Sequence, residues 1–102
     1  MHMGITGQLI EACRRNKTRA QIQLFELCYP VLMSVCRRYV SQDEAPGMLN
    51  LGFYKVLKGL QKYDFTGEVR FLQWARRVVI NAMIDDMRRN RKYKSSHIQQ
   101  DH

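Results

Sequence analysis

The sequence predicts an all-α protein, a compact bundle of four to five helices. Apolar residues recur at spacings of three and four along most of the chain, which is the period of a helix that buries one face. No stretch alternates apolar and polar residues as a half-buried strand does. A chain of 102 residues, 45% of them apolar, is expected to form one domain with a modest core.

The first element is a short helix over residues 8–15. We expect Asn16 and Lys17 to end it, and we expect residues 1–7 to be a loose end. The apolar residues of this helix that we expect to face inward are Leu9, Ile10, Ala12 and Cys13.

A longer helix is predicted over residues 18–40. Thr18 and Gln21 have the spacing of a capping box, in which each side chain binds a free amide of the first turn. Pro30 lies inside this helix, and we expect a kink or a break there because proline removes one backbone hydrogen bond.

The third helix is expected to follow a turn at residues 41–44 and to end near Gln61. Asp43 suits the N-cap position, and Pro46 suits the first helical turn. Three glycines weaken this helix by about 1 kcal/mol each relative to alanine. They are Gly47, Gly52 and Gly59.

The last helix has the longest clean helical pattern, from Phe71 to about Lys92. It follows a loop at residues 63–68, in which Gly67 is the natural turn residue. Beside its apolar face runs a second stripe that is wholly polar and mostly basic. This stripe consists of Gln73, Arg77, Asn81 and Arg88. Residues 95–102 are polar, and we expect them to fray or to begin a linker.

The charge of the chain favours a polyanionic partner. The net charge is +8, and five of the seven residues 88–94 are cationic. Arg, Asn and Gln are also the side chains that bind phosphates and base edges. The plainer interpretation of the stripe is a solvated surface that keeps the protein soluble. A membrane-surface helix fits poorly, because the most basic helix carries a full globular-type apolar face.

Aromatic residues gather around the loop and the start of the last helix. They are Tyr63, Phe65, Phe71 and Trp74. Aromatic rings stack on unpaired bases, at about 1–3 kcal/mol per base. Phe71 and Trp74 lie on the apolar stripe, so we expect both of them in the core.

The three cysteines, Cys13, Cys28 and Cys36, have no metal-binding spacing, and we interpret them as small buried residues of a reducing compartment. No signal peptide or membrane span is visible, so we expect a cytoplasmic protein.

The sequence favours a protein that is not an enzyme and needs no cofactor or metal. Asp85 and Asp86 are adjacent on a helix and point about 100° apart, so they do not form a shared metal site. We expect Asp85 to pair with Arg88 or Arg89 instead. All histidines lie in the terminal segments.

The order of residues resembles region 2 of bacterial RNA polymerase sigma factors, of the extracytoplasmic-function (ECF) type in particular. The most specific match is Trp74-Ala75-Arg76-Arg77, followed by Asn81, Asp85 and Met87-Arg88-Arg89. Three earlier pieces occur in family order. They are Leu24 to Pro30 with Arg37-Arg38-Tyr39, then Asp43 to Val56, then Lys62 to Gly67. The resemblance implies a region 2-like core over about 18–94.

The resemblance also implies a function. Such a domain binds core RNA polymerase and the non-template strand of the melted −10 promoter element, with one base flipped into a pocket formed by residues 64–70. The implied DNA-binding residues are Phe65, Thr66, Gly67, Arg70, Gln73, Arg77, Asn81, Arg88, Arg89, Arg91 and Lys92. The residues implied to bind the large polymerase subunit are Asp43, Glu44, Gly47, Asn50, Leu51 and Tyr54. An anti-sigma factor is a further possible partner, and we expect a monomer.

Two departures from the family pattern leave alternatives open. Acids that usually line the docking helix are here Pro46, Gly47 and Leu51, and only Asp43 and Glu44 remain acidic. The second DNA-binding domain of the family, which recognises the −35 element, has no counterpart in these residues. The competing hypotheses are a sigma-like module that binds a protein partner and a general nucleic-acid-binding domain that uses charge alone.

Overall fold

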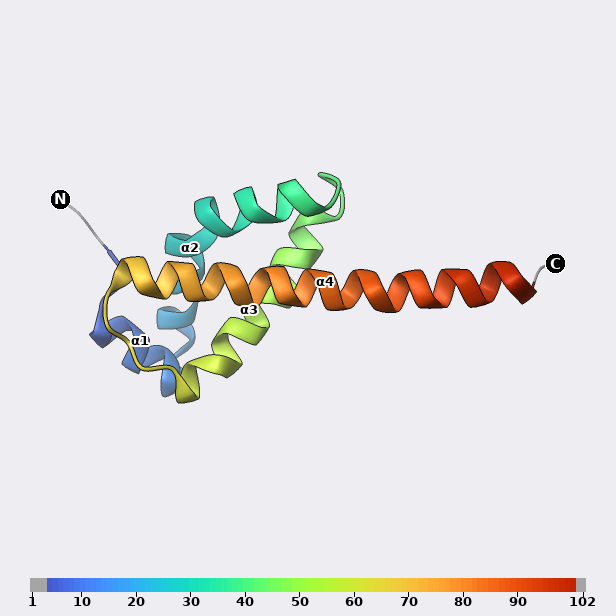
Figure 1. Ribbon diagram of the computed structural model, residues 1–102. Helices are drawn as coiled ribbons and strands as arrows, with labels where there is room; N and C mark the ends of the chain where they lie inside the picture. Colours follow the sequence, from blue (N-terminus) through green and yellow to red (C-terminus); the bar gives the residue numbers. More distant parts are fainter. Residues whose placement is uncertain (1–3, 101–102) are drawn as a thin grey trace.

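The computed structural model describes the backbone of residues 4–100 and the side chains of residues 4–90. The predicted all-α bundle is confirmed, and Figure 1 shows its arrangement. The elements in chain order are α1 (Gly7–Arg14), α2 (Thr18–Tyr39), α3 (Ala45–Gly59), the short 3-10 helix η1 (Leu60–Lys62) and α4 (Glu68–Gln100). None of the helices in this described part is long and apolar enough to cross a membrane.

Helix α4 is the longest element, and α2 and α3 pack against its first half, while α1 packs against α2 and η1 (Figure 1). The second half of α4 projects past them, which gives the molecule principal extents of 59 × 25 × 22 Å. We predicted that this helix ends near Lys92 and that residues 95–102 fray or begin a linker. The predicted end near Lys92 is wrong, because the described backbone of α4 continues to Gln100. That residues 95–102 begin a linker stays a prediction.

The core lies between α4 and the three shorter helices, and every helix contributes to it. Phe71, Leu24, Leu32 and Leu60 are among its fully buried side chains. Among the described side chains, all of the buried residues are apolar or glycine. The apolar stripes predicted from helical spacing are therefore the faces that the fold buries.

Helix α1 begins at a local cap and ends at a left-handed residue. The Thr6 hydroxyl accepts a hydrogen bond from the Leu9 backbone N–H at 3.2 Å, which satisfies one free amide of the first turn. Asn16 has a φ of 61°, a conformation that asparagine tolerates better than most residues. The predicted end of this helix at Asn16 is confirmed. The expected loose end over residues 1–7 is wrong for the described residues 4–7, because Ile5 is buried in the core and α1 begins at Gly7.

Helix α2 confirms the expected effect of Pro30 but not the expected cap. The helix runs through Pro30 without ending, and Figure 1 shows that it changes direction in its middle. The capping box of Thr18 and Gln21 is wrong, because Lys17 holds the N-cap position with no side-chain hydrogen bond. The Gln21 amide instead donates to the Cys13 carbonyl at 3.3 Å, since the end of α1 lies within its reach.

A capping box does precede α3, but at a position that we did not predict. The Ser41 hydroxyl donates to the Glu44 carboxylate at 3.0 Å and accepts from the Glu44 N–H at 3.4 Å. The Ser41 N–H also donates to the same carboxylate, at 3.5 Å. Glu44 holds the N-cap position of α3 without a side-chain cap hydrogen bond, so Asp43 is not the N-cap that we expected, whereas Pro46 does lie in the first helical turn.

Two glycines of α3 allow it to approach α4 closely. A Cβ atom on Gly52 would lie 2.9 Å from both γ-carbons of Val79 and 3.1 Å from its Cα. A Cβ atom on Gly59 would lie 2.9 Å from the Trp74 ring. These glycines weaken α3 as a helix, but they give α4 the space to pack against it. Gly47 differs, because a Cβ atom there would meet nothing within 4 Å.

We predict opposite effects of the same substitution at two of these positions. Gly47→Ala is expected to stabilise the protein by about 0.5–1 kcal/mol, through helix propensity alone. Gly52→Ala gains the same propensity but is expected to destabilise by about 1–3 kcal/mol, because the added methyl group overlaps Val79. Urea unfolding of both variants tests this, and equal stabilisation in both would show that the close contact is absent.

The three cysteines are buried and free, as the sequence predicted. Burial raises the pKa of the Cys13 thiol from 9.0 to about 11. Burial, with smaller contributions from Cys13 and Glu68, raises the pKa of Cys28 to about 12. The thiolates are therefore scarce at neutral pH, and the cysteines act as small apolar core residues.

These shifts predict that stability falls as the pH rises above about 9. Between pH 9 and 11 the unfolded chain loses thiol protons that the folded protein keeps, so deprotonation favours unfolding. Urea unfolding at pH 7, 8, 9 and 10 measures this slope. Cys28→Ala is the control, because it removes one of the shifted thiols and should make the slope shallower. An unchanged slope would contradict the assignment.

Candidate nucleic-acid and polymerase interface

The loop between η1 and α4 consists of residues 63–67, and its conformation depends on Gly67. Gly67 has a φ of 132°, which residues with a side chain rarely adopt, so the predicted turn residue is confirmed. The Gly67 carbonyl accepts the Phe71 N–H at 3.0 Å, and α4 begins directly after it. The loop therefore leads straight into the polar stripe of α4.

Aromatic packing holds the start of this loop. The ring of Tyr63 lies 4.3 Å from the ring of Trp74 and 5.5 Å, edge-on, from the ring of Phe71. Burial raises the pKa of the Tyr63 hydroxyl, although Arg70 lowers it and Asp64 raises it by smaller amounts. Phe71 is fully buried, as predicted, and Trp74 is half-buried at the edge of the core.

The middle of the loop offers one packed and one exposed side chain. Phe65 is half-buried, with its ring 6.3 Å from Phe71 and within van der Waals distance of a Cβ atom placed on Gly7. Thr66 is exposed. The loop thus presents polar groups and part of one aromatic ring to solvent.

The polar stripe of α4 is exposed along the described side chains. Its members Gln73, Arg77, Asn81 and Arg88 are all exposed, and so are the neighbouring Arg70 and Arg89. At 1.5 Å per residue, the distance from Arg70 to Arg88 along the helix is roughly 27 Å. A shallow hollow of about 250 Å³ lies within it, lined by Gln73, Arg76, Arg77 and Ile80. Arg76 is exposed and was missed as a site residue, although its position beside Arg77 could have suggested it.

The sequence also predicted two cations and one ion pair in the second half of α4. The side chains of Arg91 and Lys92 lie outside the described residues. The pairing of Asp85 with Arg88 or Arg89 is wrong, because the described side chains form neither pair. Asp86, the neighbouring acid, accepts a hydrogen bond from the Asn90 amide at 3.1 Å, and Arg88 and Arg89 are exposed.

The residues assigned to polymerase binding lie along one side of α3 and on the turn before it. Gly47, Asn50 and Tyr54 are exposed, and Leu51 is half-buried. Spacings of three and four place these four residues on one helical face. Asp43 and Glu44 are exposed on the preceding turn, where the Glu44 carboxylate also binds Ser41. The structure thus brings these residues together.

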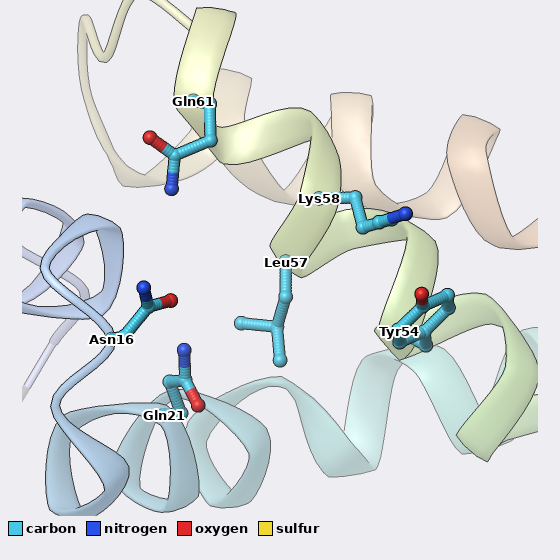
Figure 2. A pocket seen from close by; sticks show the side chains of 6 residues that line it. All are labelled: Asn16, Gln21, Tyr54, Leu57, Lys58 and Gln61. Atoms are coloured by element: carbon cyan, nitrogen blue, oxygen red, sulfur yellow. The ribbon is translucent and has the colours of Figure 1, made fainter.

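A pocket of about 420 Å³ lies where α3 faces the junction of α1 and α2, and Figure 2 shows its lining. Its lining residues are Asn16, Gln21, Tyr54, Leu57, Lys58 and Gln61. The Lys58 ammonium lies 5.3 Å from the centre of the Tyr54 ring, a cation–π distance. Apart from Tyr54, the sequence pattern did not single out these residues, because they come from three separate segments.

The described residues contain no cluster of three or more His, Cys, Asp or Glu side chains that could hold a metal ion. What the fold does present is a helix with an exposed basic face and an aromatic loop at its start. These features define a helical domain suited to a polyanion.

Comparison with known families agrees with this class. The sequence matches the family model Sigma-70 region 2 over residues 24–93, which is most of the chain, and the protein belongs to that family. No curated protein and no solved structure is significantly similar to it. In sigma factors, region 2 is a non-catalytic transcription domain that binds core RNA polymerase and recognises the −10 promoter element.

Proposed function

We propose that this protein is the promoter-recognition domain of an ECF-type sigma factor, which binds the melted non-template strand of the −10 element. The observation that carries the proposal is the continuity of two surfaces in a sigma-70 region 2 domain. The loop of residues 63–67 opens directly onto the exposed stripe of α4. A strand that follows the stripe therefore reaches the loop without leaving the protein.

The two surfaces suit two different tasks. Arg70, Arg88 and Arg89 are exposed cations, which bind phosphates without regard to sequence. Gln73 and Asn81 carry amides, which form paired hydrogen bonds with bases. The loop supplies the pocket for one flipped base, whose unstacking costs a few kcal/mol and is offset by contacts with the exposed base.

The second partner in the proposal is the large subunit of core RNA polymerase, bound by the outer face of α3. Asp43 and Glu44 supply the acidic part of this surface, and Tyr54 and Leu51 supply apolar area. An anti-sigma factor that covers the same face of α3 would block polymerase binding, and we propose it as the regulator. A cytoplasmic location follows from these partners.

The proposed contacts with phosphates predict how binding depends on salt concentration. With about three to five phosphate contacts to single-stranded DNA, the slope of log K against log salt should be about −2 to −3.5. Arg88→Ala should weaken binding to promoter-like and random strands alike and reduce the slope by about 0.7. Fluorescence anisotropy at several salt concentrations measures both quantities.

A second variant, Asn81→Ala, separates base recognition from binding by charge. Asn81→Ala should leave the salt slope unchanged and lower the preference for promoter-like strands by about 1–3 kcal/mol at the affected position. If Asn81→Ala and Arg88→Ala act equally on all strands, binding rests on charge alone, and the domain is a general nucleic-acid binder.

The outer face of α3 gives a prediction of increased affinity for core polymerase. The double variant Gly47→Asp with Leu51→Glu should bind core polymerase more tightly, mainly through a faster association rate at low salt. Gly47 has open space around it and Leu51 is only half-buried, so both acids fit. The matched control is Gly47→Asn with Leu51→Gln, which adds similar side chains without charge. Association and dissociation rates at two salt concentrations give the comparison.

Two results would contradict the docking proposal. Equal rates for the acidic variant and its uncharged control would show that acids at these positions are not needed. Unfolding of both variants would show that Leu51 is a structural residue of the domain rather than part of its binding surface.

A further inference from the structure

The segment before the matched family region contacts both ends of the DNA-facing loop. Residues 4–17 precede residue 24, where the family match begins. Helix α1 packs against η1, which leads into the loop, and the chain before α1 contacts Glu68, which follows the loop. The loop is therefore held by residues outside the matched family region.

Arg14 makes the contacts at the start of the loop. Its Nε donates to the Leu60 carbonyl at 2.8 Å, and one of its terminal nitrogens donates to the Tyr63 carbonyl. Its other terminal nitrogen binds Glu11 at 2.9 Å, and this ion pair orients the guanidinium. The Arg14 side chain is 25% exposed, against 69% for Arg15.

These contacts lie where the carboxyl ends of two helices meet. The Arg14 guanidinium binds the carbonyl of Leu60, the C-cap residue of α3, and that of Tyr63, the C-cap residue of η1. The Gln61 amide donates to the Arg14 carbonyl at 3.1 Å. The carboxyl ends of helices carry partial negative charge, so a cation between two of them is favourable. The guanidinium supplies this cation, and each helix end is capped by a side chain of the other.

The far end of the loop is held by different groups. The Ile5 N–H donates to the Glu68 carboxylate at 2.8 Å. The ring of Phe65 lies 3.6 Å from the position of a Cβ atom on Gly7. Both contacts come from residues that precede α2, so the first segment of the chain spans the loop.

We propose that Arg14 is a positioning residue for base recognition, which holds the loop in the conformation that receives the flipped base. The proposal rests on the function proposed above. Arg14 does not contact DNA in this role. It acts through the carbonyls of Leu60 and Tyr63, and a planar guanidinium fork suits two acceptors better than a single ammonium does.

The test compares Arg14→Met and Arg14→Lys with the matched control Arg15→Met, in the full chain. Two readouts are needed: the ratio of affinities for promoter-like and random single strands, and hydrogen exchange at the Tyr63 amide. The Tyr63 N–H donates to the Leu60 carbonyl, which Arg14 also binds, so its exchange reports the state of the loop. Exchange at core amides of α4 shows whether each variant is folded.

We expect Arg14→Met to lower the affinity ratio about tenfold and to speed Tyr63 exchange by a similar factor, with an unchanged salt slope. Arg14→Lys should be intermediate, because it restores the charge without the fork. Arg15→Met also removes one charge, but it should keep the wild-type ratio of affinities for promoter-like and random strands.

The outcomes separate this proposal from the one on which it rests. If the wild-type protein has no preference for promoter-like strands, the proposed function fails, and the role of Arg14 fails with it. If the wild-type preference exists and folded Arg14→Met retains it, or if Tyr63 exchange is unchanged, the role of Arg14 alone is overturned.

Discussion

The close crossing of α3 and α4 is the contact on which the rest of the structure depends. Gly52 lets the backbone of α3 approach Val79, and Gly59 leaves space for the Trp74 ring. This crossing turns the apolar side of α4 inward, so its basic stripe must face solvent. It also leaves the opposite side of α3 exposed, where the proposed polymerase surface lies. One packing constraint thus determines the direction of both candidate surfaces.

The helix ends show two ways of satisfying backbone groups. Thr6 caps α1, and Ser41 binds Glu44 on the turn before α3, and both contacts depend on local sequence alone. Arg14 and Gln61 cap carbonyls that are far away in sequence and near in space. The second kind ties α1 to the loop, which is why a segment outside the matched region affects the candidate DNA surface.

Charge has different roles on the two candidate surfaces. The exposed arginines of α4 favour a polyanion, in keeping with the net charge of +8. On the turn before α3, the Glu44 carboxylate binds Ser41 and so helps to start the helix. It remains exposed, but its position is set by its contacts with Ser41. Asp43 is the other acid on this turn.

The sequence by itself determined the fold class, the buried faces of the helices, the turn at Gly67 and the exposed stripe of α4, because helical spacing and glycine conformation are local properties. It misplaced the caps at Thr18 and Asp43, since several residues fit a capping pattern and only the actual helix start selects one. The tertiary structure alone decided the contacts of Arg14, the close packing of Gly52 and the pocket beside Tyr54. These features join distant segments, and no spacing within one segment encodes them.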